Sequence, residues 1–242
     1  MVRDEDQPSK KHKIVNLKDY AELTRVSEYG VFTTFTAIYN RISVPRNLSY
    51  LYCGVVEEFC EFKAALKLLN NAKVENISEG EEEYTQNDLN ILKGKEEAAR
   101  LDVLKELGDI TWYLTAMCNE LEIELESMVS LRFTETSEEG ETLKVRLVKL
   151  NSADLQEILD QVLTHIGTIG GKVKKSIRDD NETITDEKKM VIECSIREMF
   201  RVISVEICPL FNSTMREVMR LNAAKAASRF ARGVVQGDGD NR

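Results

Sequence analysis

Apolar residues recur three and four positions apart along most of this chain, and this spacing limits its fold more than any other feature does. Few stretches alternate apolar with polar residues, as half-buried strands would. Only three prolines and twelve glycines are present to break helices or form turns. The sequence therefore predicts an all-α protein.

The charge balance excludes two classes of partner. Apolar residues make up 42% and charged residues 31% of the chain, a composition typical of folded globular proteins. The formal net charge is -9, whereas a surface that follows a phosphate backbone or an anionic membrane needs clustered cations. We expect no nucleic-acid polymer and no membrane partner. A carboxylate pocket loaded with a divalent cation could still accept a phosphate.

The cysteines suggest a reducing environment. No C-x-x-C pair occurs, and the polar first residues lack the apolar block of a secretion signal. We therefore expect a cytoplasmic protein whose reduced thiols fill the core. The five thiols are those of Cys53, Cys60, Cys118, Cys194 and Cys208.

The chain divides into two halves with a similar order of predicted helices. We expect a flexible tail at residues 1–16, an exposed acidic loop at 70–88 and a linker at 134–142. In the first half, the periodicity and the break at Pro45 predict one helix or two at 17–42 and further helices at 50–69, 96–121 and 123–133. In the second half it predicts helices at 143–151, 153–177, 188–207 and 213–232.

Two helices of the first half each carry a pair of carboxylates. Glu58 and Glu61 are three residues apart, as are Glu106 and Asp109, so each pair projects from one side of its helix. If these helices pack antiparallel, four carboxylates converge, and their repulsion requires a divalent cation. Hard oxygen ligands indicate Mg²⁺ or Mn²⁺. Glu57 flanks the first pair as a further candidate ligand.

The alternative is that these carboxylates lie on ordinary solvated faces of acidic helices. The surroundings of Glu106 and Asp109 favour the site, because so apolar a helix has little reason to expose its acidic face. Tyr113 continues the same stripe one turn further on. The apolar neighbours are Leu104, Leu107, Ile110, Trp112 and Leu114.

Two segments, V-V-E-E-F-C-E-F-K-A-A-L-K and K-E-L-G-D-I-T-W-Y-L-T-A-M-C-N-E-L-E-I, resemble the MazG-type all-alpha nucleoside triphosphate pyrophosphohydrolases. That family is similar in fold to dimeric dUTPases, and its motif is E-E-x-x-E followed by E-x-x-D. Glu57 matches the first glutamate of that motif, but its side chain points about 100° round the helix from Glu58. The acidic insertion at 70–88 makes the spacing between the motifs longer than usual. The resemblance implies that Mg²⁺ is held by Glu58, Glu61, Glu106 and Asp109.

The second half resembles the same family in degenerate form. His165, Thr168 and Gly171 stand near the expected glutamate positions, and Met199 stands where the aspartate belongs. The resemblance implies a helical bundle of two MazG-like four-helix repeats, at 17–133 and 143–242. The second repeat would bind no metal.

The last helix resembles the C-terminal part of the family, which implies that Asn222, Lys225 and Arg229 contact the substrate phosphates. Tyr113, on the carboxylate stripe, and Lys175, from a basic group at 172–178, are further candidate substrate contacts. The alternative for this last helix is a surface helix with scattered cations.

The sequence and the resemblance together predict a Mg²⁺-dependent nucleoside triphosphate pyrophosphohydrolase. It would cleave a (deoxy)nucleoside triphosphate to the monophosphate and pyrophosphate, and so clean the nucleotide pool. Glu58 or Glu61 would accept the proton of the attacking water. The alternatives are a dUTPase or dCTPase type of hydrolase and a non-catalytic nucleotide-sensing helical module. A homodimer is expected, although internal duplication leaves the oligomeric state open.

Overall fold

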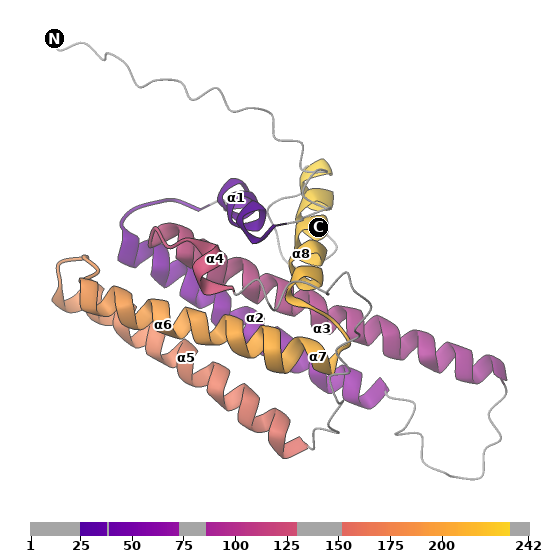
Figure 1. Cartoon of the computed structure of the whole chain (residues 1–242). Helices are drawn as coiled ribbons and strands as arrows, with labels where there is room; N and C mark the ends of the chain where they lie inside the picture. Colours follow the sequence, from indigo (N-terminus) through magenta and orange to yellow (C-terminus); the bar gives the residue numbers. More distant parts are fainter. Residues whose placement is uncertain (1–24, 38, 73–85, 130–151, 233–242) are drawn as a thin grey trace.

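The computed structural model describes residues 25–37, 39–72, 86–129 and 152–232, and all regular structure within these ranges is helical (Figure 1). The predicted all-α fold is confirmed. The helices are α1 (Val26–Thr36), α2 (Val44–Ala72), α3 (Gln86–Glu120), α4 (Leu125–Met128), α5 (Ser152–Asp179), α6 (Asp186–Val202), η4 (Ile203–Ile207), α7 (Cys208–Leu210) and α8 (Met215–Ala231).

Four long helices form the body of the molecule. The α2 helix packs along α3 in the most extensive contact of the fold, and α5 packs on both α2 and α6 (Figure 1). The α8 helix crosses α3, and α1 contacts both α3 and α8. The first and last described helices therefore meet on α3, so residues far apart in sequence come together there.

The apolar stripes predicted for α2 and α3 form the centre of the core. On α2 the stripe at Leu51, Val55 and Phe59 is buried, while Leu66, also predicted to be apolar-facing, is half-buried. On α3 the residues closest to the predicted acidic pair, Leu107 and Ile110, are almost completely buried. Helical periodicity thus placed the packed faces of both helices correctly.

Several helix ends differ from the predicted ones. The α2 helix begins at Val44 rather than near residue 50, because Pro45 lies in the first turn, where its missing N–H breaks no helical hydrogen bond. The α3 helix begins at Gln86, ten residues before the predicted start at Glu96. The α6 helix begins after Thr185, whose hydroxyl accepts a hydrogen bond from the backbone N–H of Lys188.

The predicted helix at 188–207 changes its winding before its end. A π-helical turn, η4, follows α6 directly and leads into Pro209 in α7. Proline lacks the N–H that an α-helical interior would use, so a local change of winding accommodates it. Within the predicted helix at 123–133, α4 covers Leu125–Met128, and residues 130–133 lie outside the described residues.

Some predicted segments lie outside the described residues. These are the tail 1–16, the linker 134–142, the helix 143–151 and most of the loop 70–88. Across the described helices, none combines the length and the apolar character needed to cross a membrane.

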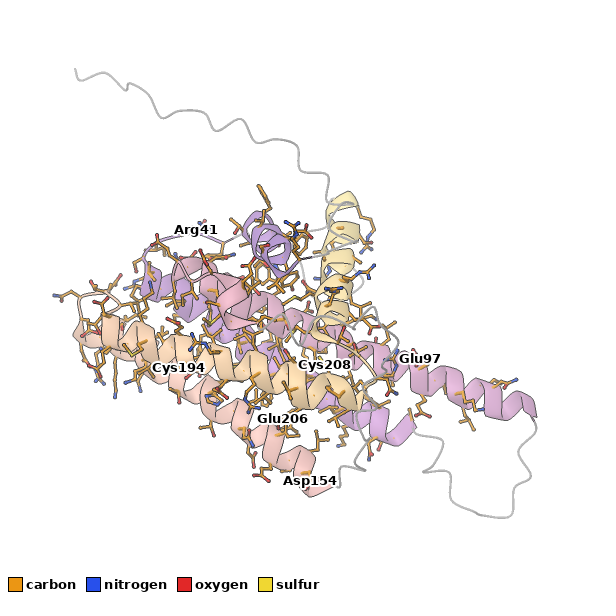
Figure 2. The ribbon with its side chains drawn as sticks, viewed as in Figure 1. Arg41, Glu97, Asp154, Cys194, Glu206 and Cys208 are labelled. Carbon is orange, nitrogen blue, oxygen red and sulfur yellow. The ribbon has the colours of Figure 1, made fainter. Side chains whose placement is uncertain are left out.

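The expectation that all five cysteines fill the core is wrong. Cys118 and Cys208 are buried, whereas Cys53, Cys60 and Cys194 are exposed, and all five are free thiols. Figure 2 labels Cys194 on α6 and Cys208 at the junction with α7. The exposed thiols lie on the outer sides of long amphipathic helices, where the apolar period does not reach.

The connection between α1 and α2 is held by a carboxylate at the end of α3. Tyr39 donates a hydrogen bond of 2.5 Å from its hydroxyl to Glu120, and Asn47 donates one of 2.8 Å from its side-chain amide to the same carboxylate. Arg41 lies 3.4 Å from it. This cluster fixes where α2 begins relative to α3.

Candidate metal centre

Three of the predicted carboxylates meet between α2 and α3. Glu58 of α2 and Glu106 and Asp109 of α3 each place one carboxylate oxygen within 4.8 Å of the others. All three side chains are half-buried. The antiparallel packing assumed from the sequence therefore brings acidic groups of both helices into a common space.

A glycine allows α2 and α3 to approach closely beside this cluster. A Cβ atom at Gly54 would lie 2.2 Å from the ring of Tyr113, so only glycine leaves room for that ring. Gly54 is one turn before Glu58, and Tyr113 is one turn after Asp109. The tight contact places Glu58 opposite the acidic side of α3.

A second glycine brings α8 against the same turn of α3. A Cβ atom at Gly108 would lie 2.9 Å from the Cβ of Asn222 and 3.2 Å from the carbonyl oxygen of Val218. The two helices therefore cross with backbone close to backbone. Asn222 is consequently next to Asp109, the residue that follows Gly108.

Asp109 is contacted by two side chains of α8. Asn222 donates a 2.6 Å hydrogen bond from Nδ2 to Oδ1 of Asp109, and the ammonium of Lys225 donates to Oδ2. The Lys225 and Asp109 side chains are only 14% and 15% exposed. The resemblance had assigned Asn222 and Lys225 to the phosphates, and the structure places both directly beside the carboxylate cluster.

A buried tyrosine completes this group. Tyr29 of α1 is fully buried and donates a 2.8 Å hydrogen bond from its hydroxyl to Oδ1 of Asn222. Burial, followed by the charge of Asp109, raises the pKa of Tyr29, so its hydroxyl stays a donor. No role in the site was predicted for Tyr29 from the sequence. The signal was tyrosine rather than phenylalanine in a core stripe, since a buried hydroxyl needs a partner.

The carboxylates act strongly on one another. Burial, then the charges of Asp109, Glu61 and Glu106, raise the pKa of Glu58 to about 8, while Lys225 opposes this rise. Burial is the largest cause of this rise and the neighbouring carboxylates add to it, so the ionised form of Glu58 is disfavoured in the metal-free protein.

Glu61 and Glu57, the other acids of the first motif, lie at the edge of the cluster. Both are exposed. The charge of Glu61 raises the pKa of Glu58, and Glu57 contributes to raising the pKa of Tyr113 after burial and Glu58. Three residues correspond to a rotation of about 300° on a helix, which carries Glu61 onto the flank while Glu58 faces α3.

The remaining candidate substrate contacts are placed differently. Arg229 is half-buried on α8, one turn beyond Lys225, and therefore on the side of the helix that faces the cluster. Lys175 is exposed on α5, where its charge acts on Asp179. Among the described residues, the structure brings Lys225 next to the carboxylates and leaves Lys175 on the bundle surface.

The three carboxylates fit a hard divalent cation. They offer oxygen ligands from two helices, and a cation between them would offset the mutual repulsion that contributes to the raised pKa of Glu58. Mg²⁺ is commonly held by few protein carboxylates, with its remaining positions taken by water and substrate phosphates. Such a cation would leave room for further ligands beside the ammonium of Lys225, which donates to Asp109.

Comparisons with known proteins give a partial match. No family model matches the chain, and no solved structure matches it. The chain is similar to the "Gene 37 protein" of Mycobacterium phage L5, with 33% identity over 76 residues. That match covers 31% of this chain and 66% of the phage protein, just under two thirds of the relative's length.

Proposed function

We propose that this protein is a Mg²⁺-dependent nucleoside triphosphate pyrophosphohydrolase that converts a (deoxy)nucleoside triphosphate to the monophosphate and pyrophosphate. The observation that carries the proposal is the convergence of Glu58, Glu106 and Asp109 within 4.8 Å beside the ammonium of Lys225. A cation held by carboxylates next to a lysine suits a phosphate chain. The identity of the reaction rests on the resemblance of both acidic motifs to the MazG-type family.

The residues of the cluster have distinct roles in this proposal. When bound, Mg²⁺ would offset the negative charge of the phosphates and lower the pKa of a coordinated water. With a pKa of about 8, Glu58 is mostly protonated near neutral pH in the metal-free protein, and a bound cation would favour its ionised form, which can accept a proton from the attacking water. Lys225 and Arg229 lie on the side of α8 that can contact the phosphates. Water attacks phosphorus, and pyrophosphate leaves with the electron pair of the broken P–O bond.

We also propose that the two halves are copies of one ancestral unit. In support, each half supplies a long pair of adjacent helices, α2 with α3 and α5 with α6. The acids of the first pair have no counterpart at the matching positions of the second, where Met199 is completely buried and His165 is half-buried. The second pair would then serve as a scaffold that packs on α2 and α3.

The test is release of pyrophosphate from each common ribo- and deoxyribonucleoside triphosphate, with Mg²⁺ and with EDTA. We expect turnover only with Mg²⁺, and its loss in Asp109→Asn. The matched control is Asp102→Asn, because Asp102 lies on the same helix but is exposed and pairs with Lys105. Dominant turnover of dUTP or dCTP would indicate the narrower hydrolase. Absence of turnover on the whole panel would refute the proposal and favour a non-catalytic module.

A further inference from the structure

The hydroxyl of Tyr29 is an unusual polar group in an apolar part of the core. The ring lies between α1, α3 and α8 with no exposed surface, and it stacks on Phe32 at 5.8 Å between ring centroids. Phenylalanine would fill the same volume without placing an oxygen there. The hydroxyl therefore has a role beyond packing, and the proposed chemistry does not yet use it.

The hydrogen bonds around Asn222 have a fixed direction. The ionised carboxylate of Asp109 can only accept, so Asn222 must turn its Nδ2 toward Asp109. Its Oδ1 then faces away from Asp109 into the core, where Asn222 is 4% exposed and the oxygen needs a donor. The Tyr29 hydroxyl supplies that donor at 2.8 Å.

We propose that Tyr29 is a positioning residue for the metal centre, which acts through Asn222 to fix the orientation of the Asp109 carboxylate. This inference rests on the proposed function, because it assumes that Asp109 is a metal ligand. Oδ1 of Asp109 is held by the Tyr29–Asn222 pair, and Oδ2 is held by Lys225.

The physical reason lies in the symmetry of the amide. An asparagine side chain has nearly the same shape when its amide is turned by 180°, so packing alone does not choose between the two orientations. The turned amide would place its oxygen against the carboxylate of Asp109. The Asp109 carboxylate disfavours the turned amide, and the Tyr29 hydroxyl adds to this preference, because it donates to Oδ1 in the orientation in which Asn222 donates to Asp109. Partners behind a ligand commonly change metal affinity by about 10- to 100-fold.

The test is Mn²⁺ affinity, measured by the electron paramagnetic resonance signal of free Mn²⁺. We expect Tyr29→Phe to weaken binding by about 10- to 100-fold. Tyr39→Phe is the matched control, because it removes a hydroxyl that also bonds to a carboxylate, Glu120, about 16 Å further along α3. An unchanged affinity in Tyr29→Phe, or an equal loss in Tyr39→Phe, would overturn the inference.

A double variant tests whether Tyr29 acts through Asn222. If it does, Tyr29→Phe combined with Asn222→Ala binds Mn²⁺ no more weakly than Asn222→Ala alone. Independent, additive losses would overturn the inference. If the wild-type protein binds no Mn²⁺, the proposed metal function fails and this inference fails with it. If the wild type binds and Tyr29→Phe binds equally well, only the inference fails.

Discussion

Replacement of Lys225 by methionine should destabilise the metal-free protein and make its stability depend strongly on Mg²⁺. The ammonium donates to Asp109 in a pair that is about 85% buried, and its charge also opposes the rise in the pKa of Glu58. Methionine keeps much of the side-chain volume but removes the positive charge. Glu58, Glu106 and Asp109 then face one another without that cation.

The expected size follows from the burial of the pair. Removal of one partner of a buried ion pair costs about 3 to 5 kcal/mol, and the residual exposure of both groups points to the lower end, about 3 kcal/mol. For a protein of this length, that corresponds to a fall in melting temperature of roughly 6 to 12 °C. Mg²⁺ at about one hundred times its dissociation constant returns about 2.7 kcal/mol. At the same Mg²⁺ concentration the wild type gains less, because competition between the cation and Lys225 for Asp109 raises the dissociation constant.

Calorimetric melting in EDTA and in Mg²⁺ measures both quantities. Lys188→Met is the matched control, because Lys188 forms a similarly buried pair with Asp180 at the junction of α5 and α6, away from the carboxylate cluster. We expect this control to lose stability that Mg²⁺ does not restore. The reasoning is refuted if Lys225→Met melts like the wild type in EDTA, or if Mg²⁺ raises the melting temperatures of wild type, Lys225→Met and Lys188→Met equally.

Three further outcomes are expected. Gly108→Ala should cost about 1 to 3 kcal/mol in urea unfolding and weaken Mn²⁺ binding, because its Cβ would lie 3.2 Å from the Val218 carbonyl and 2.9 Å from the Asn222 Cβ. The pKa of Glu58 is raised on folding from 4.5 to about 8, so the folded metal-free protein binds the extra proton. The contribution of this proton to folding stability is therefore full below about pH 4.5 and is lost as the pH rises through 8. Mg²⁺ affinity, measured by calorimetry, should rise over the same pH interval, because the cation binds the ionised carboxylate. Glu61→Gln should lower the pKa of Glu58, as measured by carbon-13 NMR; an unchanged pKa would contradict the proximity of the two acids.

The sequence predicted the two acidic helices and, on the condition that they pack antiparallel, the convergence of four carboxylates, of which the structure groups three. Spacing alone placed Glu106 and Asp109 on one side of α3, and the apolar context indicated that this side was not fully solvated. The structure brings both to Glu58. The same spacing argument was less informative for Glu61, since residues three apart differ by about 60° around the helix, enough to separate a facing side chain from a flanking one.

Other features depend on tertiary packing that no local pattern encodes. The helical period could not predict that α1 and α8 both lie on α3, nor that Tyr29 contacts Asn222 193 positions later in the chain. It also gave no clear reason to extend α3 back to Gln86, because the apolar residues of those first turns, Leu89, Ile91 and Leu92, are followed by none at residues 93–97. Two glycines of the sequence relate to this packing, since a Cβ atom at Gly54 would meet Tyr113 and one at Gly108 would meet Asn222.

The candidate metal centre combines side chains of α2 and α3 with side chains of α8, so it forms only when these distant parts of the chain pack together. The carboxylates come from α2 and α3, but the two groups that contact Asp109 come from α8, more than one hundred positions later. Without α8, the same three carboxylates would remain while the ammonium and amide that hold Asp109 would be lost. The acidic helices would then repel each other with less compensation, so the last helix contributes to the stability of the first helix pair as well as to the chemistry proposed there.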